Sequence, residues 1–160
     1  MSQVTSISRT GQLRTFRWLI AVVGLVIIAA IAYGVFMLIR MNTLPADLDM
    51  SISRVSEQAV FRGSWKSQLE PININQIHNW TIHVETPDGK PVENSQISVD
   101  GGMPQHGHGL PTQPQVTEYL GQGNYRVEGM KFNMPGWWVV KFQVTANGRS
   151  DLLQFNLMVK

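Results

Sequence analysis

The sequence predicts an all-β fold, a sandwich of about seven strands preceded by one N-terminal transmembrane helix. Residues 18–39 form a long uncharged apolar stretch. From about Trp65 onward, short segments of alternating apolar and polar residues are separated by turn residues. These segments recur at the spacing of roughly 8–12 residues that is typical of sandwich domains. No helical periodicity interrupts them, so we expect one β-domain of about 90 residues, a usual domain size.

Residues 18–39 are long enough to cross a membrane. A helix over this stretch rises about 33 Å, against about 30 Å of bilayer hydrocarbon. Arg9, Arg14 and Arg17 precede the stretch, whereas only Arg40 follows it. The positive-inside rule therefore predicts a cytoplasmic tail over residues 1–17. We expect a single-pass protein of the cell inner membrane with its C-terminal domain in the periplasm.

A cleaved signal peptide is the competing interpretation of this segment. Ala30 and Ala32 have the small-x-small spacing of a cleavage site. However, the apolar run continues for seven more residues and exceeds the 7–15 residues of a usual signal core. We therefore expect an uncleaved anchor.

The charge is divided unequally along the chain. Residues 1–40 hold four arginines and no acid, a net charge of +4, whereas residues 41–160 hold nine Lys and Arg against eleven Asp and Glu, a net charge of −2. The basic character therefore comes from the membrane flank and does not indicate a nucleic-acid-binding face. The absence of cysteine excludes disulfides and thiolate chemistry. No nucleophile triad, phosphate loop or dinucleotide motif is present, so we do not expect an enzyme.

Residues 40–64 are predicted to be a spacer, and the domain is predicted to occupy residues 65–160. Leu48, Ile52, Val55 and Ala59 have helical spacing, which favours a short amphipathic helix followed by a linker.

Within the domain, alternation predicts which side chains face the core. Trp80, Ile82 and Val84 share one face of the first clear strand. Turns are predicted at residues 87–91 and 121–123 and at the Asn-Gly pair 147–148. The Cys…Trp…Cys core of antibody domains is absent, so we expect a general Ig-like sandwich. The remaining expected inward residues are Ile97, Val99, Trp138, Val140, Phe142, Val144, Leu153, Phe155, Leu157 and Val159.

The chemically distinctive segment is the Gly/Pro-rich loop 101–111. His106 and His108 lie two residues apart, so in extended backbone both imidazoles point the same way. Met103 precedes them, and Met130 and Met134 lie on or just after the expected strand 124–130, one of the strands that can neighbour this loop in a sandwich. Imidazole and thioether ligands without thiolate suit a copper ion better than zinc. The alternative is that the loop is only a solvated turn and that Met103 fills the end of the core.

Neighbouring residues bear on this loop. Asp100 is either a second-sphere partner that orients an imidazole or a turn residue. Trp138 is expected in the core, which leaves Trp137 outside. There it covers a sheet face, covers the histidine loop, contacts a partner or meets lipid headgroups. We expect His83 to be solvated on a polar face and His78 to lie at a strand edge.

Four motifs, taken together, resemble the YtkA-like domain family over residues 68–158. They are Asp-Gly-Lys-Pro-Val at 88–92, Met-Pro-Gln-His-Gly-His-Gly at 103–109, Gly-Asn-Tyr at 123–125 and Phe-Asn-Met-Pro-Gly-Trp-Trp at 132–138. The resemblance implies an Ig-like sandwich on the outer side of a bacterial membrane. The FixH proteins, linked to assembly of copper-containing terminal oxidases, are more distantly similar. Carried onto this sequence, the resemblance implies metal ligands at Met103, His106, His108 and Met134.

Two functions are consistent with these patterns. The first is a membrane-anchored module that binds copper and holds it or delivers it to a membrane or periplasmic acceptor such as an oxidase. The second is a metal-free structural or assembly subunit that docks onto a larger membrane protein complex. Lipid is a partner through residues 18–39 in either case, and nucleic acid is not.

Overall fold

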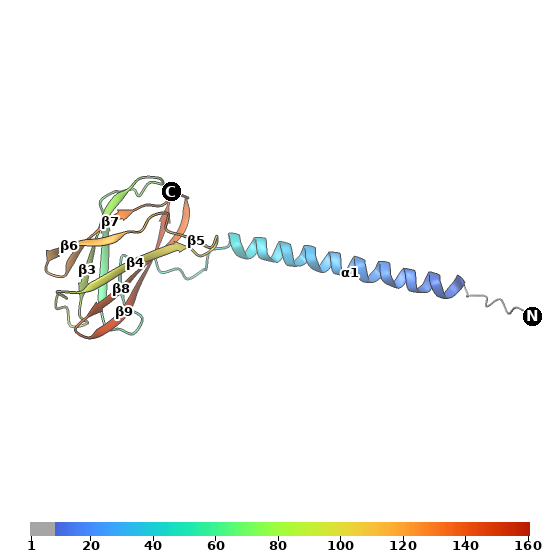
Figure 1. Ribbon diagram of the computed structural model, residues 1–160, viewed down its shortest axis with the longest axis horizontal. Helices are drawn as coiled ribbons and strands as arrows, with labels where there is room; N and C mark the ends of the chain where they lie inside the picture. The colour runs from blue at the N-terminus through green and yellow to red at the C-terminus, as the bar shows by residue number, and fades with distance from the viewer. Residues whose placement is uncertain (1–8) are drawn as a thin grey trace, which may run out of the picture. The chain divides into compact units, whose positions relative to one another are not determined.

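A computed structural model describes residues 9–160. The chain divides into a helical unit that ends at Thr43 and a β-unit, residues 44–160 (Figure 1). The predicted fold class is confirmed: the β-unit is antiparallel throughout, and one apolar helix precedes it in the sequence. Residues 1–8 of the predicted cytoplasmic tail lie outside the described range.

Helix α1 (Arg9–Asn42) is longer than the apolar stretch at both ends. Its segment Phe16–Met41 is long and apolar enough to cross a membrane. At the C-terminal end the Thr43 amide and hydroxyl both donate to the Ile39 carbonyl, at 3.0 and 2.9 Å. Pro45 follows two residues later and disfavours further helix. The helix is thus compatible with a single-pass membrane anchor.

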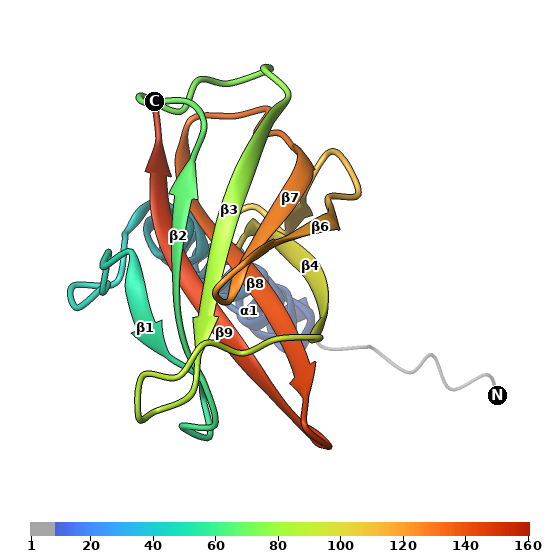
Figure 2. The same ribbon diagram turned by 90° about the vertical axis from the view of Figure 1, so that its left-hand side faces the viewer.

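The strands form one continuous ladder in the order β1-β2-β3-β7-β6-β4-β8-β9, with β5 paired to β4. The β6–β4 junction has a single register pair, Ser98 opposite Gln115. The ladder folds at this junction into two layers, and Figure 2 shows β2, β3 and β7 lying over β8 and β9. The strands are β1 (Ser53–Val55), β2 (Arg62–Ser67), β3 (His78–Glu85), β4 (Gln96–Met103), β5 (His108–Gly109), β6 (Gln115–Gly121), β7 (Asn124–Met130), β8 (Gly136–Ala146) and β9 (Arg149–Val159).

The core lies between the two layers, and the predicted alternation is confirmed. Every second residue of β3 is buried, and so is every second residue of β9 from Asp151 to Val159. The Trp80 ring approaches Phe142 of the opposite layer with centroids 6.5 Å apart. Burial of these large side chains is the main source of stability for a domain without disulfides. Ile97 and Val99 are only partly buried, because β4 lies near the fold of the ladder.

The predicted turns are confirmed by backbone geometry. Asn147 and Gly148 have φ angles of 53° and 72°, as the type I′ turn of a two-residue hairpin requires. This turn joins β8 and β9, which pair without interruption over eleven register positions from Gly136 opposite Val159 to Ala146 opposite Arg149.

The prediction of an amphipathic helix in the spacer is wrong. The chain instead forms β1 and then enters β2 at Arg62, so the sheet begins inside the range 40–64. The Trp65 amide donates to the Ile52 carbonyl at 3.1 Å and extends the β1–β2 pairing by one step. Pairing with the edge of β2 decides the structure of this segment, because tertiary context outweighs a weak helical periodicity in the sequence.

Buried groups in the turn after β1 hold this segment onto the sandwich. Phe61 is 2% exposed and belongs to the core cluster. The buried Asp151 carboxylate of β9 accepts hydrogen bonds from the Ser56 hydroxyl at 2.5 Å and from the amides of Gln58 and Val60. The spacer therefore contributes core and polar contacts that a flexible linker would lack.

Candidate functional site

The histidine loop is a tight hairpin between β4 and β5. Met103 and His108 are register partners on its two strands, and residues 104–107 form the turn. The amides of His106 and Gly107 donate to the Met103 carbonyl at 3.1 and 2.9 Å. Gly107 has a φ of 65°, which places the left-handed residue that such four-residue turns need just before β5.

Two glycines let this hairpin lie close to its neighbours. A Cβ on Gly102 would lie 2.3 Å from the His108 carbonyl oxygen, and one on Gly101 would lie 2.5 Å from the Val139 oxygen. Both atoms belong to backbone, so neither can move aside without breaking a strand pairing. These glycines therefore allow β5 and β8 to approach β4, which fixes the hairpin that carries the histidines.

The hairpin brings the two imidazoles side by side and exposes both to solvent. Their ring centroids are 6.3 Å apart and their planes differ by 22°. Two imidazoles that share one ion at the metal–nitrogen distance of about 2 Å have centroids roughly 5–6 Å apart. Small rotations of exposed side chains bring the pair into that range. His106 lies in the turn, so the turn geometry causes this convergence, whereas we expected it from extended backbone.

The two methionines occupy different environments. Met103 is 1% exposed, and a Cβ on Gly136 would lie 3.1 Å from its terminal methyl. Met134 is partly buried against the core, two residues before Gly136, and its carbonyl accepts the Trp138 indole N–H at 3.0 Å. Both thioethers are thus placed by core packing around the start of β8, whereas the imidazoles are free to adapt.

A groove of about 410 Å³ runs along the outer face beside the hairpin. His108 and Met103 line it together with the glycine backbone and three outward side chains of β8: Trp137, Val139 and Lys141. Exposed Asp100 also lines the groove and lies opposite Lys141 in the β4–β8 register. An imidazole, a carboxylate and an amine therefore lie at one surface, whereas the Met103 side chain, 1% exposed, belongs to the core cluster.

The orientation of Trp137 is fixed from the far side of the groove. Its indole N–H donates to the Asn156 amide oxygen at 3.1 Å, and the Asn156 amide nitrogen donates to the Asp49 carbonyl at 2.9 Å. Asn156 is 6% exposed, so these bonds satisfy a buried amide. Trp138 is fully buried, which confirms the predicted division between the two tryptophans. Trp137 covers a sheet face and borders the histidine groove.

The other two histidines have partners that the sequence did not reveal. His78 is buried rather than at an open edge: its Nδ1 contacts the Gln76 carbonyl at 3.0 Å and its Nε2 accepts the Trp80 indole N–H at 3.0 Å. Both ring nitrogens are therefore occupied within the core. The sequence did carry one signal for this contact: a Trp two residues after a His on a strand lies on the same face as that His.

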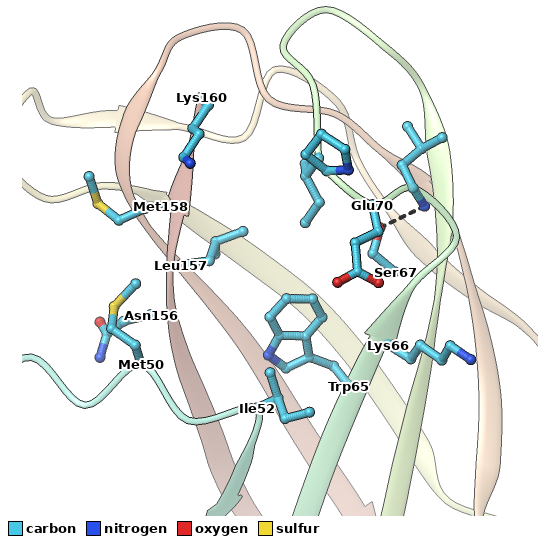
Figure 3. A pocket seen from close by; sticks show the side chains of 13 residues that line it. Met50, Ile52, Trp65, Lys66, Ser67, Glu70, Asn156, Leu157, Met158 and Lys160 are labelled. Carbon is cyan, nitrogen blue, oxygen red and sulfur yellow. Dashed lines mark hydrogen bonds between the residues drawn. The ribbon is translucent and has the colours of Figure 1, made fainter.

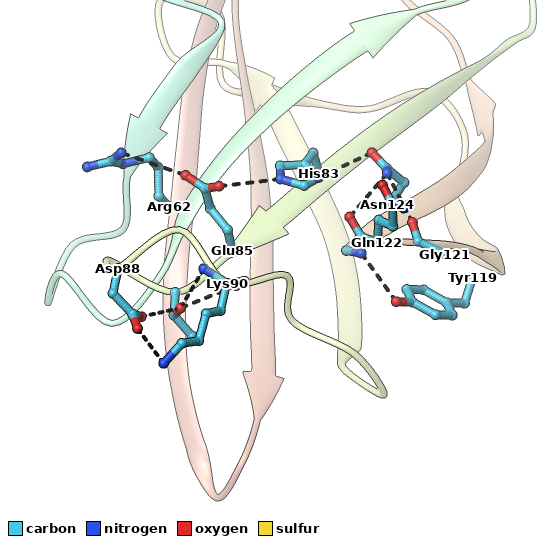
Figure 4. A network of polar contacts seen from close by, with 11 residues as sticks. Arg62, His83, Glu85, Asp88, Lys90, Tyr119, Gly121, Gln122 and Asn124 are labelled. Atoms are coloured by element: carbon cyan, nitrogen blue, oxygen red, sulfur yellow. Dashed lines mark hydrogen bonds and ion pairs between the residues drawn. The ribbon is translucent and has the colours of Figure 1, made fainter.

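His83 is half-buried in a polar network rather than simply solvated (Figure 4). Its Nδ1 lies 3.2 Å from the Asn124 amide oxygen, and its Nε2 lies 3.6 Å from a Glu85 carboxylate oxygen. The second oxygen of Glu85 faces Arg62 at 3.7 Å. This network joins β2, β3 and β7 on the polar face and leaves the hairpin pair as the two exposed histidines of the described chain.

Within residues 9–160, no group of three or more His, Cys, Asp or Glu side chains is arranged to hold a metal ion.

The fold and this surface define a class: a β-sandwich with a histidine hairpin on one face, preceded in the sequence by an apolar helix. The YtkA-like family model matches residues 64–143, half of the chain, and this protein belongs to that family. A solved structure of a DUF4426 family protein from Pseudomonas aeruginosa PAO1 is similar, with 14% identity and a TM-score of 0.48 over 68% of this chain and 94% of that one. No functionally curated protein matches the sequence.

Proposed function

We propose that this protein is a membrane-anchored periplasmic copper-binding module that holds the ion or delivers it to a membrane or periplasmic acceptor such as an oxidase. The observation that carries the proposal is the pair of exposed imidazoles, 6.3 Å apart, on a hairpin whose groove is lined by Met103. Imidazole binds both copper oxidation states and thioether favours Cu(I), so this donor set suits an ion that must be held and then released.

The ligands in this proposal are His106, His108 and Met103, with Met134 as a fourth donor from the same end of the sandwich. The exposed imidazoles capture the ion, because they reorient without disturbing the core. In this proposal Met103 supplies the sulfur, which requires its side chain, 1% exposed, to turn out of the core cluster toward the hairpin. Trp137 borders the groove beside it. The anchor confines the site to the membrane surface and so raises its effective concentration near a membrane acceptor.

A competition titration of the full chain in detergent, with Cu(I) and Cu(II) against a chromophoric chelator, tests the proposal. We expect one-to-one binding that the double substitution His106→Ala and His108→Ala weakens at least about a hundredfold, since two of the ligands are lost. His83→Ala is the matched control, because it removes an imidazole elsewhere and should leave the affinity unchanged. Copper affinity that is equal in all three proteins would overturn the proposal.

The periplasmic location has its own test, which the cysteine-free sequence makes simple. A single cysteine introduced at exposed Lys90 should react with a membrane-impermeant maleimide in intact spheroplasts. Labelling only after lysis would place the β-unit in the cytoplasm and contradict the orientation expected from the arginines.

A metal-free docking subunit is the second candidate function. The observation that favours it is an uncovered seam between β2 and β9, which lies apart from the histidine hairpin.

A further inference from the structure

A second pocket, of about 480 Å³, lies at the seam between β2 and β9 (Figure 3). The ladder begins at β1-β2 and ends at β9, so this seam is where the sandwich remains open. Strand β1 and the turn after it cover one half of the seam, through contacts with β9 and the Glu57 amide bond to the Leu152 carbonyl at 3.0 Å. The pocket occupies the other half, beside Asn156, Leu157 and Met158.

The edge of β9 presents unpaired backbone groups to this pocket. In an antiparallel strand the N–H and C=O of one residue point to the same side, and the side alternates along the chain. The Leu152 carbonyl points away from β8, toward Glu57, so the backbone groups of Asn156 and Met158 also point away from β8. No strand of residues 9–160 pairs with β9 on that side. An edge of this kind is a template for another extended chain.

The floor of the pocket carries a further unpaired donor. Trp65 stacks on Trp80 with centroids 4.2 Å apart, and its indole nitrogen is turned toward β9 in Figure 3. That nitrogen is buried and has no hydrogen-bond acceptor among the described residues. A buried N–H without an acceptor is costly. An incoming chain with a carbonyl at this point would remove that cost.

Exposed apolar side chains surround these polar groups. Ile52 is 58% exposed, Met158 is 47% exposed and Met50 is 41% exposed, and all three line the pocket. Lys66, Glu70 and Lys160 supply charge of both signs at the rim. Apolar contacts beside a row of unsatisfied main-chain groups match an extended peptide, which alternates side chains with backbone donors and acceptors.

We propose that this seam binds an extended segment of a partner protein, which adds as a strand to the free edge of β9. A lipid chain would fill the apolar surface but could not satisfy the row of N–H and C=O groups. This inference is independent of copper binding, since the seam contains none of the proposed ligands.

The probe for this site is a library of displayed random linear peptides, selected on the full chain in detergent. We expect selected peptides that alternate apolar and polar residues and that slow hydrogen exchange at the Asn156 and Met158 amides. Met158→Pro removes one outward N–H without breaking the β8 pairing, a position where an edge strand tolerates proline. It should weaken peptide binding about tenfold or more, since a main-chain hydrogen bond is lost and the edge is distorted.

The matched control is Met158→Ala, which keeps the N–H and should retain most of the peptide affinity. Copper affinity should be unchanged in both variants, so failure here is distinct from failure of the metal proposal. The proposal is overturned if no peptide is enriched, or if Met158→Pro binds the selected peptides as wild type does. It is equally overturned if binding leaves amide exchange at Asn156 and Met158 unchanged, a readout that requires no variant. Concentration-dependent dimers that Met158→Pro abolishes, or a co-purified lipid in the seam, would also overturn the proposal, because they would show a different occupant.

Discussion

Single polar side chains determine how the chain enters and closes this sandwich. Asp151 is 3% exposed and accepts hydrogen bonds from Ser56, Gln58, Val60 and its neighbour Leu152. Burial raises the pKa of this carboxyl, but the four donors outweigh burial and hold the pKa below its ordinary value of 3.8. The charged carboxylate therefore fastens the turn after β1 to β9.

Replacing Asp151 with alanine should lower the free energy of unfolding by about 2–4 kcal/mol, because several buried donors lose their acceptor. Chemical denaturation of both proteins measures this difference. The folded pKa lies below the unfolded one, so the contribution is fully present above pH 3.8 and is lost as the pH falls through the folded pKa. The two stabilities should consequently converge in acid. Asp88→Ala, which breaks an exposed ion pair with Lys90, is the control and should change little.

At the scale of elements, the β4–β5 hairpin depends on glycines whose roles the sequence did not distinguish. A run containing several glycines reads as flexible, yet Gly102 stands against a carbonyl oxygen, whereas a Cβ on Gly109 would have only one neighbour, at 3.8 Å. The hairpin therefore requires glycine at position 102, where the strands lie close together, and tolerates a side chain at position 109.

Gly102→Ala should separate β5 from β4 and destabilise the domain by about 1–3 kcal/mol, the usual cost of overpacking against backbone. Gly109→Ala should be nearly neutral, which makes it a matched control on the paired strand. Thermal unfolding together with amide exchange at Leu110, whose N–H donates to the Gly101 carbonyl, measures both effects. Equal stability of the two variants would contradict the close approach described for Gly102.

Regular strands were predictable because local pattern and tertiary role agree there. The β7 range 124–130 and the inward residues of β3, β8 and β9 follow from period-two alternation alone. The structure of residues 40–64 was not predictable from the sequence, because β1 forms only by pairing with β2. Phe61 in this range is buried by a turn that distant Asp151 holds in place. For the histidine hairpin, the sequence indicated that the two imidazoles lie side by side. The Asn156 contact that orients Trp137 and the unpaired Trp65 nitrogen depend on long-range packing and left no local signal.

For the molecule as a whole, the β-unit extends from residue 44, and its integrity depends on the segment before Trp65. A fragment of residues 44–160 retains β1, β2 and the partners of Asp151. A fragment of residues 65–160 lacks β1 and half of β2, and it loses the buried side chains of Val60 and Phe61.

We expect the longer fragment to unfold in one cooperative transition and the shorter one to show no transition, because loss of an edge and two core side chains exceeds typical domain stability margins. Circular dichroism during heating, with dispersion of amide proton shifts as a second readout, distinguishes them. Equal cooperativity in both fragments would show that the segment before Trp65 is dispensable.

Copper binding at the histidine hairpin is tested by X-ray absorption at the copper edge on the full chain loaded with one equivalent of Cu(I). We expect scattering from two imidazoles and from thioether sulfur. The sulfur contribution should be reduced in Met103→Leu, and the imidazole contribution should be lost in the His106→Ala, His108→Ala variant. A copper spectrum that is identical in wild type and in both variants would contradict copper binding at the hairpin.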